Sequence, residues 1–103
     1  MKLVYAKSAL EDIQQVKQYI AKVLKNRKAA DRIVAMISKN CKQLKDQPYS
    51  GTSLEPRVGE PTDLRYLVCE NWIAFYRVRE DVVQIVRVLD GRTDYWRILL
   101  SEN

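Results

Sequence analysis

Three apolar runs in the second half of the chain constrain its fold most. Residues 64–69, 72–79 and 82–89 are rich in valine, isoleucine and aromatic side chains, which favour strands. Only two residues separate each run from the next, Glu70-Asn71 and Glu80-Asp81. Two residues form a tight hairpin turn, although neither pair contains the glycine that favours the commonest turn type. The sequence therefore predicts a three-stranded antiparallel meander.

Both faces of this predicted sheet are mainly apolar. Alternation along strands joined by two-residue turns places Leu64, Tyr66, Val68, Ile73, Phe75, Arg77, Gln84, Val86 and Val88 on one face. The other face receives Arg65, Leu67, Cys69, Trp72, Ala74, Tyr76, Val78, Val83, Ile85, Arg87 and Leu89. An antiparallel sheet with one solvated face would alternate polar and apolar residues, so both faces must be covered. A helical layer can cover one. The C-terminal segment, a second copy or a partner protein covers the other, and the partner is favoured because the segment is short.

The first half of the chain predicts a short strand at 3–5 and two helices. Ser8 and Glu11 have the spacing of a capping box, and a stripe of apolar residues follows at intervals of three and four: Leu10, Ile13, Val16, Ile20, Val23 and Leu24. Asn26 can end this helix and cap the next, whose stripe is Ala30, Ile33, Val34, Ile37, Cys41 and Leu44. Because their connection is short, we expect an antiparallel helical hairpin.

Turn-forming residues dominate positions 46–62, which we interpret as a surface loop, and a short amphipathic segment ends the chain. The expected fold class is therefore α+β. It comprises an N-terminal strand, an αα-hairpin, a three-stranded antiparallel meander and a short C-terminal helical segment, in a single domain over 1–103.

The composition excludes several classes of function. The 103 residues contain no histidine, which excludes Ser-His-Asp and Cys-His catalysis and most metal sites. Cys41 and Cys69 have no metal-ligand spacing, and we expect them to be reduced thiols of a cytoplasmic protein. We expect no metal and no cofactor. No apolar run approaches the roughly 20 residues that cross a bilayer, so no membrane association is expected.

The net charge of +5 is unevenly distributed. Residues 1–46 contain 11 basic and 4 acidic side chains, which gives +7, and residues 47–103 contain seven arginines and nine acidic side chains, which gives −2. A basic chain favours an acidic partner, either nucleic acid or an acidic protein surface. The lysines of the helical hairpin can equally form a solvated face. The second half contains arginine alone, the residue suited to fixed bidentate contacts.

Arg65 and Arg87 are charged positions on otherwise apolar strands. A buried guanidinium needs a carboxylate or several carbonyl groups, and Glu11, Asp12 and Asp94 are the candidate carboxylates. The two arginines are either structural ion pairs or a site for an anion or partner.

Several segments resemble the RelE/ParE superfamily of bacterial type II toxins. They are residues 8–13 with Tyr19-Ile20, residues 29–33, residues 47–51, Leu64-Arg65, residues 72–78 and residues 85–94. The chain is nearer to the ParE branch, although Asp90 stands where many relatives have histidine. The resemblance implies a β-α-α-β-β-β toxin that a cognate antitoxin neutralises by wrapping around it.

The superfamily has two activities: members cleave messenger RNA on the ribosome, or bind and inhibit DNA gyrase. RNA cleavage without metal or histidine needs a base and cations near the phosphate. The resemblance implies that cleaving members supply these groups with lysine and arginine on the sheet and with arginine and tyrosine near the C-terminus. In this chain those positions are Leu64, Tyr66 and Ile73 on the sheet and positions near Thr93 and Leu99, none of them basic.

Gyrase inhibition by binding is therefore the preferred hypothesis, with Arg77, Arg92, Tyr95, Trp96 and Arg97 as target-binding residues. Packing onto the sheet as core is the alternative role of the aromatic pair. The alternative function is a ribosome-dependent mRNA endonuclease, whose partners are ribosome and message and whose catalytic residues would be Arg65, Arg92 and Tyr95. Arg65, Trp72, Tyr76 and Arg87 either bind the antitoxin or form structural ion pairs. The resemblance is compatible with a homodimer or a toxin–antitoxin hetero-oligomer.

Overall fold

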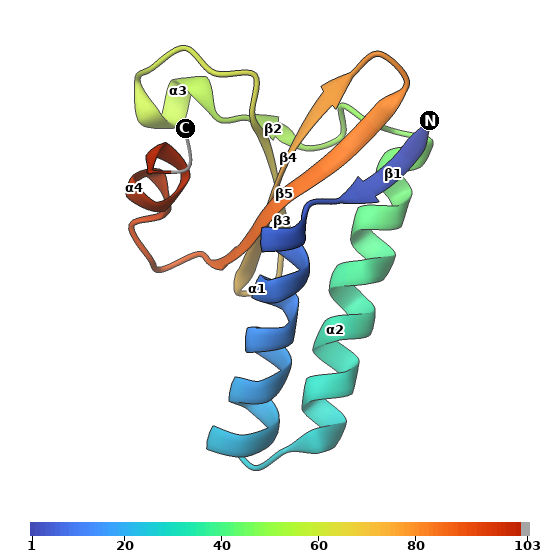
Figure 1. Ribbon diagram of the computed structural model, residues 1–103, viewed down its shortest axis with the longest axis vertical. Coiled ribbons are helices and arrows are strands. Elements are labelled where there is room, and N and C mark those ends of the chain that lie inside the picture. The colour runs from blue at the N-terminus through green and yellow to red at the C-terminus, as the bar shows by residue number, and fades with distance from the viewer. Residues whose placement is uncertain (102–103) are drawn as a thin grey trace.

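A five-stranded mixed sheet carries a helical hairpin (Figure 1). The computed structural model describes residues 1–101. Its strands are β1 (Lys2–Tyr5), β2 (Thr52–Ser53), β3 (Arg65–Cys69), β4 (Trp72–Arg79) and β5 (Val82–Asp90). They lie in the order β1-β5-β4-β3-β2; β1 is parallel to β5 and all other pairs are antiparallel. The predicted α+β class and the meander of β3, β4 and β5 are confirmed.

The helices comprise a long helical hairpin and two short separate helices. The hairpin consists of α1 (Lys7–Gln18), a π-helical turn η1 (Tyr19–Val23) and α2 (Arg27–Lys42), which continues into the 3-10 turn η2 (Gln43–Lys45). The short helices are α3 (Glu55–Val58) and α4 (Tyr95–Leu100). In Figure 1 the hairpin extends past the sheet, so that its connecting turn lies far from both termini. None of the helices within residues 1–101 is long and apolar enough to cross a membrane.

Both hairpin turns of the meander contain two residues, as predicted. Cys69 pairs with Trp72, and the first turn residue, Glu70, adopts a left-handed backbone with φ 58°. Glu80 does the same in the second turn, with φ 54°. Non-glycine residues at positive φ are uncommon, so these turns form without the glycine that usually supplies this conformation.

A β-bulge in β5 shifts the alternation of the residues that follow it. Tyr76 pairs with Ile85 but Phe75 pairs with Arg87, so Val86 is an extra residue in β5. Beyond it the alternation shifts by one position. Val88 consequently joins the core under the helical hairpin, and Leu89 joins the core on the opposite face. The predicted faces of Val88 and Leu89 were wrong for this reason.

The second sheet face is covered by the chain itself. Leu54 is fully buried there beside Phe75 and Leu99, and Val58 and Trp96 pack against the same cluster. The favoured expectation that a partner protein covers this face was wrong, because residues 46–62, predicted as a surface loop, pack Leu54 and Val58 against it. Together, α3 and α4 close the face that α4 alone would leave open.

The apolar stripe predicted for the first helix is not the face that packs against the sheet. Leu10, Val23 and Leu24 are 52%, 63% and 57% exposed, whereas Ala9 and Asp12 are buried. Hydrogen bonds from the start of α1 to β5 fix which side of the helix faces the sheet. The wider π-helical turn and the reach of the hairpin beyond the sheet leave the end of the stripe in solvent.

Of the two predicted helix caps, one is present. Asn26 caps α2, where its Oδ1 accepts a hydrogen bond from the Ala29 N–H at 3.0 Å, although Lys25 takes the left-handed backbone. The capping box of Ser8 and Glu11 was wrong. The helix begins at Lys7 with Ala6 as its N-cap, two residues before the predicted cap, and the Ser8 hydroxyl instead donates to the Val86 carbonyl at 3.0 Å.

Candidate protein-binding surface

An ion pair joins α1 to β5 where β1 ends. Beyond Ile85 the outer edge of β5 no longer pairs with β1, and Asp12 of α1 takes over. Its Oδ2 accepts from the Val88 N–H at 2.9 Å and from Arg87 Nε at 2.7 Å, and its Oδ1 accepts from Arg87 Nη2 at 2.8 Å. Both side chains are largely buried. Arg87 was predicted to form either a structural ion pair or a site for an anion or partner. In the structure it forms an ion pair, and its partner Asp12 is one of the three candidate carboxylates.

Tyr76 and Arg65 hold the loop before β2. The buried Tyr76 hydroxyl donates to the Pro48 carbonyl at 2.8 Å and accepts from the Gly51 N–H at 3.0 Å. Arg65 Nη2 donates to the carbonyls of Tyr49 at 3.2 Å and Gly51 at 2.6 Å, and its guanidinium lies 5.2 Å from the centroid of the Tyr49 ring. Both side chains therefore anchor this loop, and Arg65 uses carbonyl groups, one of the two kinds of partner that the sequence predicts for it.

A cleft of about 350 Å³ lies between α4 and the segment before β3. We call it the C-terminal cleft; it is lined by Glu60, Pro61, Thr62, Leu64, Arg77, Trp96, Leu99 and Leu100. It brings together Arg77 and Trp96, two of the five predicted target-binding residues. A cation thus lies beside an aromatic ring and leucines, the composition typical of interface anchors.

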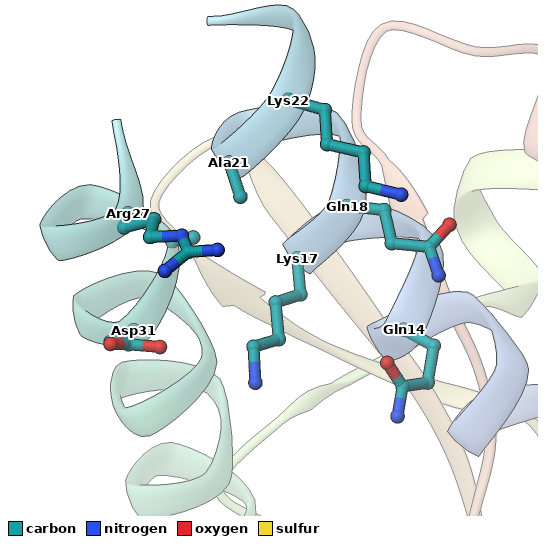
Figure 2. Close-up of a pocket in the computed structure, with 8 residues that line it drawn as sticks. Gln14, Lys17, Gln18, Ala21, Lys22, Arg27 and Asp31 are labelled. Atoms are coloured by element: carbon teal, nitrogen blue, oxygen red, sulfur yellow. The ribbon is translucent and has the colours of Figure 1, made fainter. Parts of the chain in front are cut away.

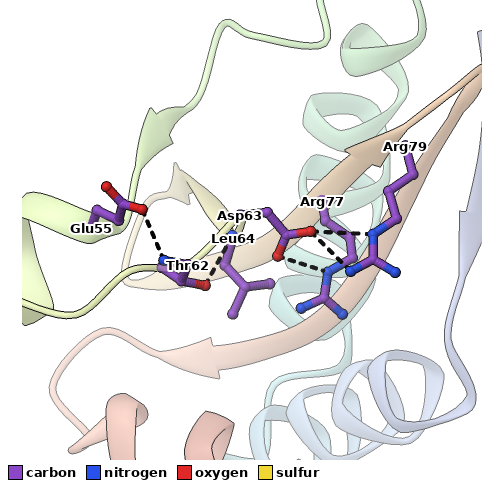
Figure 3. A network of polar contacts seen from close by, with 6 residues as sticks. All are labelled: Glu55, Thr62, Asp63, Leu64, Arg77 and Arg79. Atoms are coloured by element: carbon purple, nitrogen blue, oxygen red, sulfur yellow. Dashed lines mark hydrogen bonds and ion pairs between the residues drawn. The ribbon is translucent and has the colours of Figure 1, made fainter.

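Asp63 orients the arginine of this cleft (Figure 3). Its carboxylate accepts from Arg77 Nε at 3.3 Å and from Arg79 Nε and Nη2 at 3.2 and 3.0 Å. Burial by itself would raise the pKa of Asp63, but the two guanidinium groups outweigh it and lower that pKa. The Thr62 N–H donates to Glu55 Oε1 at 3.0 Å and steadies the adjoining segment.

The terminal nitrogens of Arg77 have no acceptor among the residues that the structure describes. Its side chain is only 23% exposed, whereas that of Arg79 is 69% exposed and lies outside the cleft. Arg77 therefore presents a positioned donor pair to any acceptor that enters the cleft, because its Nε is fixed by Asp63.

A second cleft, of about 500 Å³, runs along α1. We call it the α1 cleft; it is lined by Asp12, Gln15, Val16, Tyr19, Trp72, Arg87, Val88, Leu89, Asp90, Arg92 and Ile98. Trp72 and Arg87, two of the predicted antitoxin-binding residues, both line it. Arg92 donates to Asp90 at 2.8 and 3.1 Å, and this contact lowers the pKa of that carboxyl group. Because α4 contributes side chains to each cleft, it separates them.

The structure does not assemble the three residues proposed for RNA cleavage. Arg65 is engaged by loop carbonyls, Arg92 by Asp90, and the Tyr95 ring packs against Phe75 with centroids 5.0 Å apart. These contacts belong to three different parts of the fold. The Tyr95 ring thus contributes to the packing of α4 against the sheet.

Arg97 lies in neither cleft; it pairs with Asp94 at 3.1 Å and is 87% exposed.

Two residues of the clefts, Asp63 beside Arg77 and Tyr19 in the α1 cleft, were not predicted from the sequence. Asp63 could have been found, because a two-residue turn after Cys69 places position 63 opposite position 78, between Arg77 and Arg79. Tyr19 had no comparable signal. In the described part of the chain, no group of three or more potential metal ligands occurs.

Comparison with known proteins concerns the family and the fold. The model of a family described as the ParE toxin of the type II toxin-antitoxin system, parDE, matches residues 3–95. A solved structure described as the chromosomal ParDE TA system from P. aeruginosa has the same fold, with a TM-score of 0.74 and 24% sequence identity. The alignment covers 87% of this chain and 95% of that one. No curated protein sequence matches significantly.

Proposed function

The chain belongs to the ParE toxin family of type II toxin–antitoxin systems, and we propose that it inhibits DNA gyrase by binding and is neutralised by a cognate antitoxin. The observation that carries the proposal is the C-terminal cleft. There Arg77 offers terminal donors beside Trp96, and Asp63 holds it in place.

Binding accounts for this site better than catalysis does. An acceptor on the target can meet the Arg77 donors while an apolar side chain fills the space beside Trp96 and Leu99. Among the described residues that line the cleft, Glu60 is the one carboxylate, and no lysine lies beside it to act as a second catalytic group. Messenger RNA cleavage has no comparable support, because its three candidate residues are engaged in separate contacts.

The α1 cleft is the proposed site of the antitoxin. It is the larger of the two and combines the apolar Trp72, Leu89 and Ile98 with the exposed cation Arg92. A partner that brings apolar side chains flanked by carboxylates fits this lining. Because α4 separates the clefts, an antitoxin bound in the α1 cleft would cover one side of the element that also contacts the target.

Two assays of the purified protein test the proposed target. The protein is added to a gyrase supercoiling reaction and, separately, to a translating extract in which messages are mapped by primer extension. We expect supercoiling to be inhibited and messages to stay intact. Codon-phased cuts in the message, with gyrase unaffected, would contradict the proposal.

The antitoxin site is tested with a matched pair of arginines. Arg92 and Arg97 are similarly exposed and each pairs with an aspartate, but only Arg92 lines the α1 cleft. We expect Arg92→Ala to weaken binding of the antitoxin encoded beside the toxin and Arg97→Ala to leave it unchanged, as measured by calorimetry. Equal affinities of the two variants would place the antitoxin elsewhere.

A further inference from the structure

A third cleft, separate from the two beside α4, opens between the arms of the helical hairpin near its connecting turn (Figure 2). Its volume is about 360 Å³, and it is lined by Gln14, Lys17, Gln18, Ala21, Lys22, Arg27, Ala30 and Asp31. Lys17 and Lys22 extend from the α1 arm and Arg27 from the start of α2. We call it the hairpin cleft.

Within residues 1–101, the three cations of the hairpin cleft have no ion-pair partner. Of the described residues, no lysine forms an ion pair, and Arg27 forms none either. The one carboxylate in the lining, Asp31, leaves two positive charges in excess. The arginines of the sheet differ, since most of them are paired with aspartates of the chain itself. The excess positive charge of residues 1–46 is thus available to an external anion.

The start of α2 adds to this field. Sixteen residues long, α2 begins at Arg27, so the positive end of its dipole lies at the hairpin cleft. The amides of Gln14 and Gln18 supply neutral donors beside the cations. Cations, amide donors and a helix N-terminus are the groups with which proteins contact phosphate oxygens.

The lining distinguishes phosphate from an acidic protein segment. Protein interfaces rely on large apolar or aromatic anchors, and the only apolar residues here are Ala21 and Ala30. Lysine is a compact charge on a flexible stem, which suits sequence-independent contacts with a phosphate backbone. The hairpin also projects beyond the sheet, so an extended ligand can reach the cleft (Figure 1). We propose that the hairpin cleft binds the phosphodiester backbone of a nucleic acid.

Two triple variants of equal charge test this site. The first, Lys17→Gln with Lys22→Gln and Arg27→Gln, empties the cleft of cations. The control, Lys39→Gln with Lys42→Gln and Lys45→Gln, removes the same charge from exposed lysines at the other end of the hairpin. All six side chains are exposed, so both proteins should fold, and circular dichroism checks this.

Binding is measured by fluorescence anisotropy with short labelled duplexes of arbitrary sequence, one of DNA and one of RNA, over a salt series. The unaltered protein should bind at low salt. The first variant should lose affinity. The slope of the logarithm of its binding constant against the logarithm of the salt concentration should fall in magnitude by about one for each phosphate contact removed. The control should lose much less, and the duplex bound more tightly identifies which nucleic acid the cleft takes. Absence of binding to both duplexes, or equal losses in the two variants, would overturn the proposal.

Discussion

Replacing Asp12 by alanine should destabilise the fold strongly, because three hydrogen bonds end on its carboxylate. Two come from Arg87 and one from the Val88 N–H. The carboxylate connects α1 to the edge of β5, where no neighbouring strand is available. Its removal therefore weakens the contact between the helical hairpin and the sheet as well as the ion pair.

The expected loss follows from burial. The side chains of Asp12 and Arg87 are 7% and 15% exposed, and breaking so buried a pair by removing one partner costs about 3–5 kcal/mol. Small proteins are stable by about 5–15 kcal/mol in total, so the variant should unfold at a much lower urea concentration. The paired replacement Asp12→Leu with Arg87→Met removes both charges and should recover most of this loss.

Urea unfolding followed by circular dichroism measures the effect, and Asp94→Ala is the control. Asp94 also pairs with an arginine, but both partners are solvent-exposed, so its loss should cost less than about 1 kcal/mol. If Asp12→Ala costs no more than Asp94→Ala, the structural role assigned to the Asp12–Arg87 pair is refuted.

Three further predictions concern packing and titration. Gly51→Ala should cost about 1–3 kcal/mol of unfolding free energy, since a Cβ there would lie 2.5 Å from the Tyr76 hydroxyl; a cost near zero in urea unfolding would contradict this close contact. Burial raises the pKa of the Cys41 thiol to about 12 and also raises the pKa of Cys69, so iodoacetamide should modify neither thiol at mildly alkaline pH unless urea is added. Mass spectrometry measures the labelling, and rapid labelling of the folded protein would show that the thiols are accessible. Because the pKa of Asp63 is lowered in the folded protein, its ionised carboxylate stabilises the fold at pH values above its ordinary pKa of 3.8, and this stability is lost as the pH falls through the folded-state pKa. Asp63→Asn should therefore make the unfolding free energy fall less steeply at acid pH, and an unchanged pH dependence would contradict this role of Asp63.

Strands and turns could be predicted from the sequence because local signals fix them. The two-residue gaps at Glu70 and Glu80 set the register of β3, β4 and β5, and the observed strand bounds differ from the predicted ones by one residue at most. The cap at Asn26 is equally local. The capping box at Ser8 failed because its hydroxyl found a tertiary partner, the carbonyl of Val86.

Features that depend on contacts between elements could not be predicted. Apolar residues stand on both faces of β5 around the bulge at Val86, so nothing in the sequence marks where the alternation shifts. Leu54 lies among turn formers, and its complete burial depends on the packing of α3 and α4 against the sheet. Residue type was enough to identify Arg77 and Trp96 as candidate site residues. The clefts themselves could not be predicted, because they form only when α4 packs against the sheet.

Inhibition of gyrase supercoiling by two arginine variants tests the central claim most directly. Arg77 and Arg79 lie on one strand and share Asp63, but only Arg77 lines the C-terminal cleft. We predict that Arg77→Gln raises the inhibitory concentration about tenfold or more, as expected when a positioned charge contact of an interface is lost, and that Arg79→Gln leaves it unchanged. Equal inhibition by Arg77→Gln and the unaltered toxin would contradict binding through this cleft.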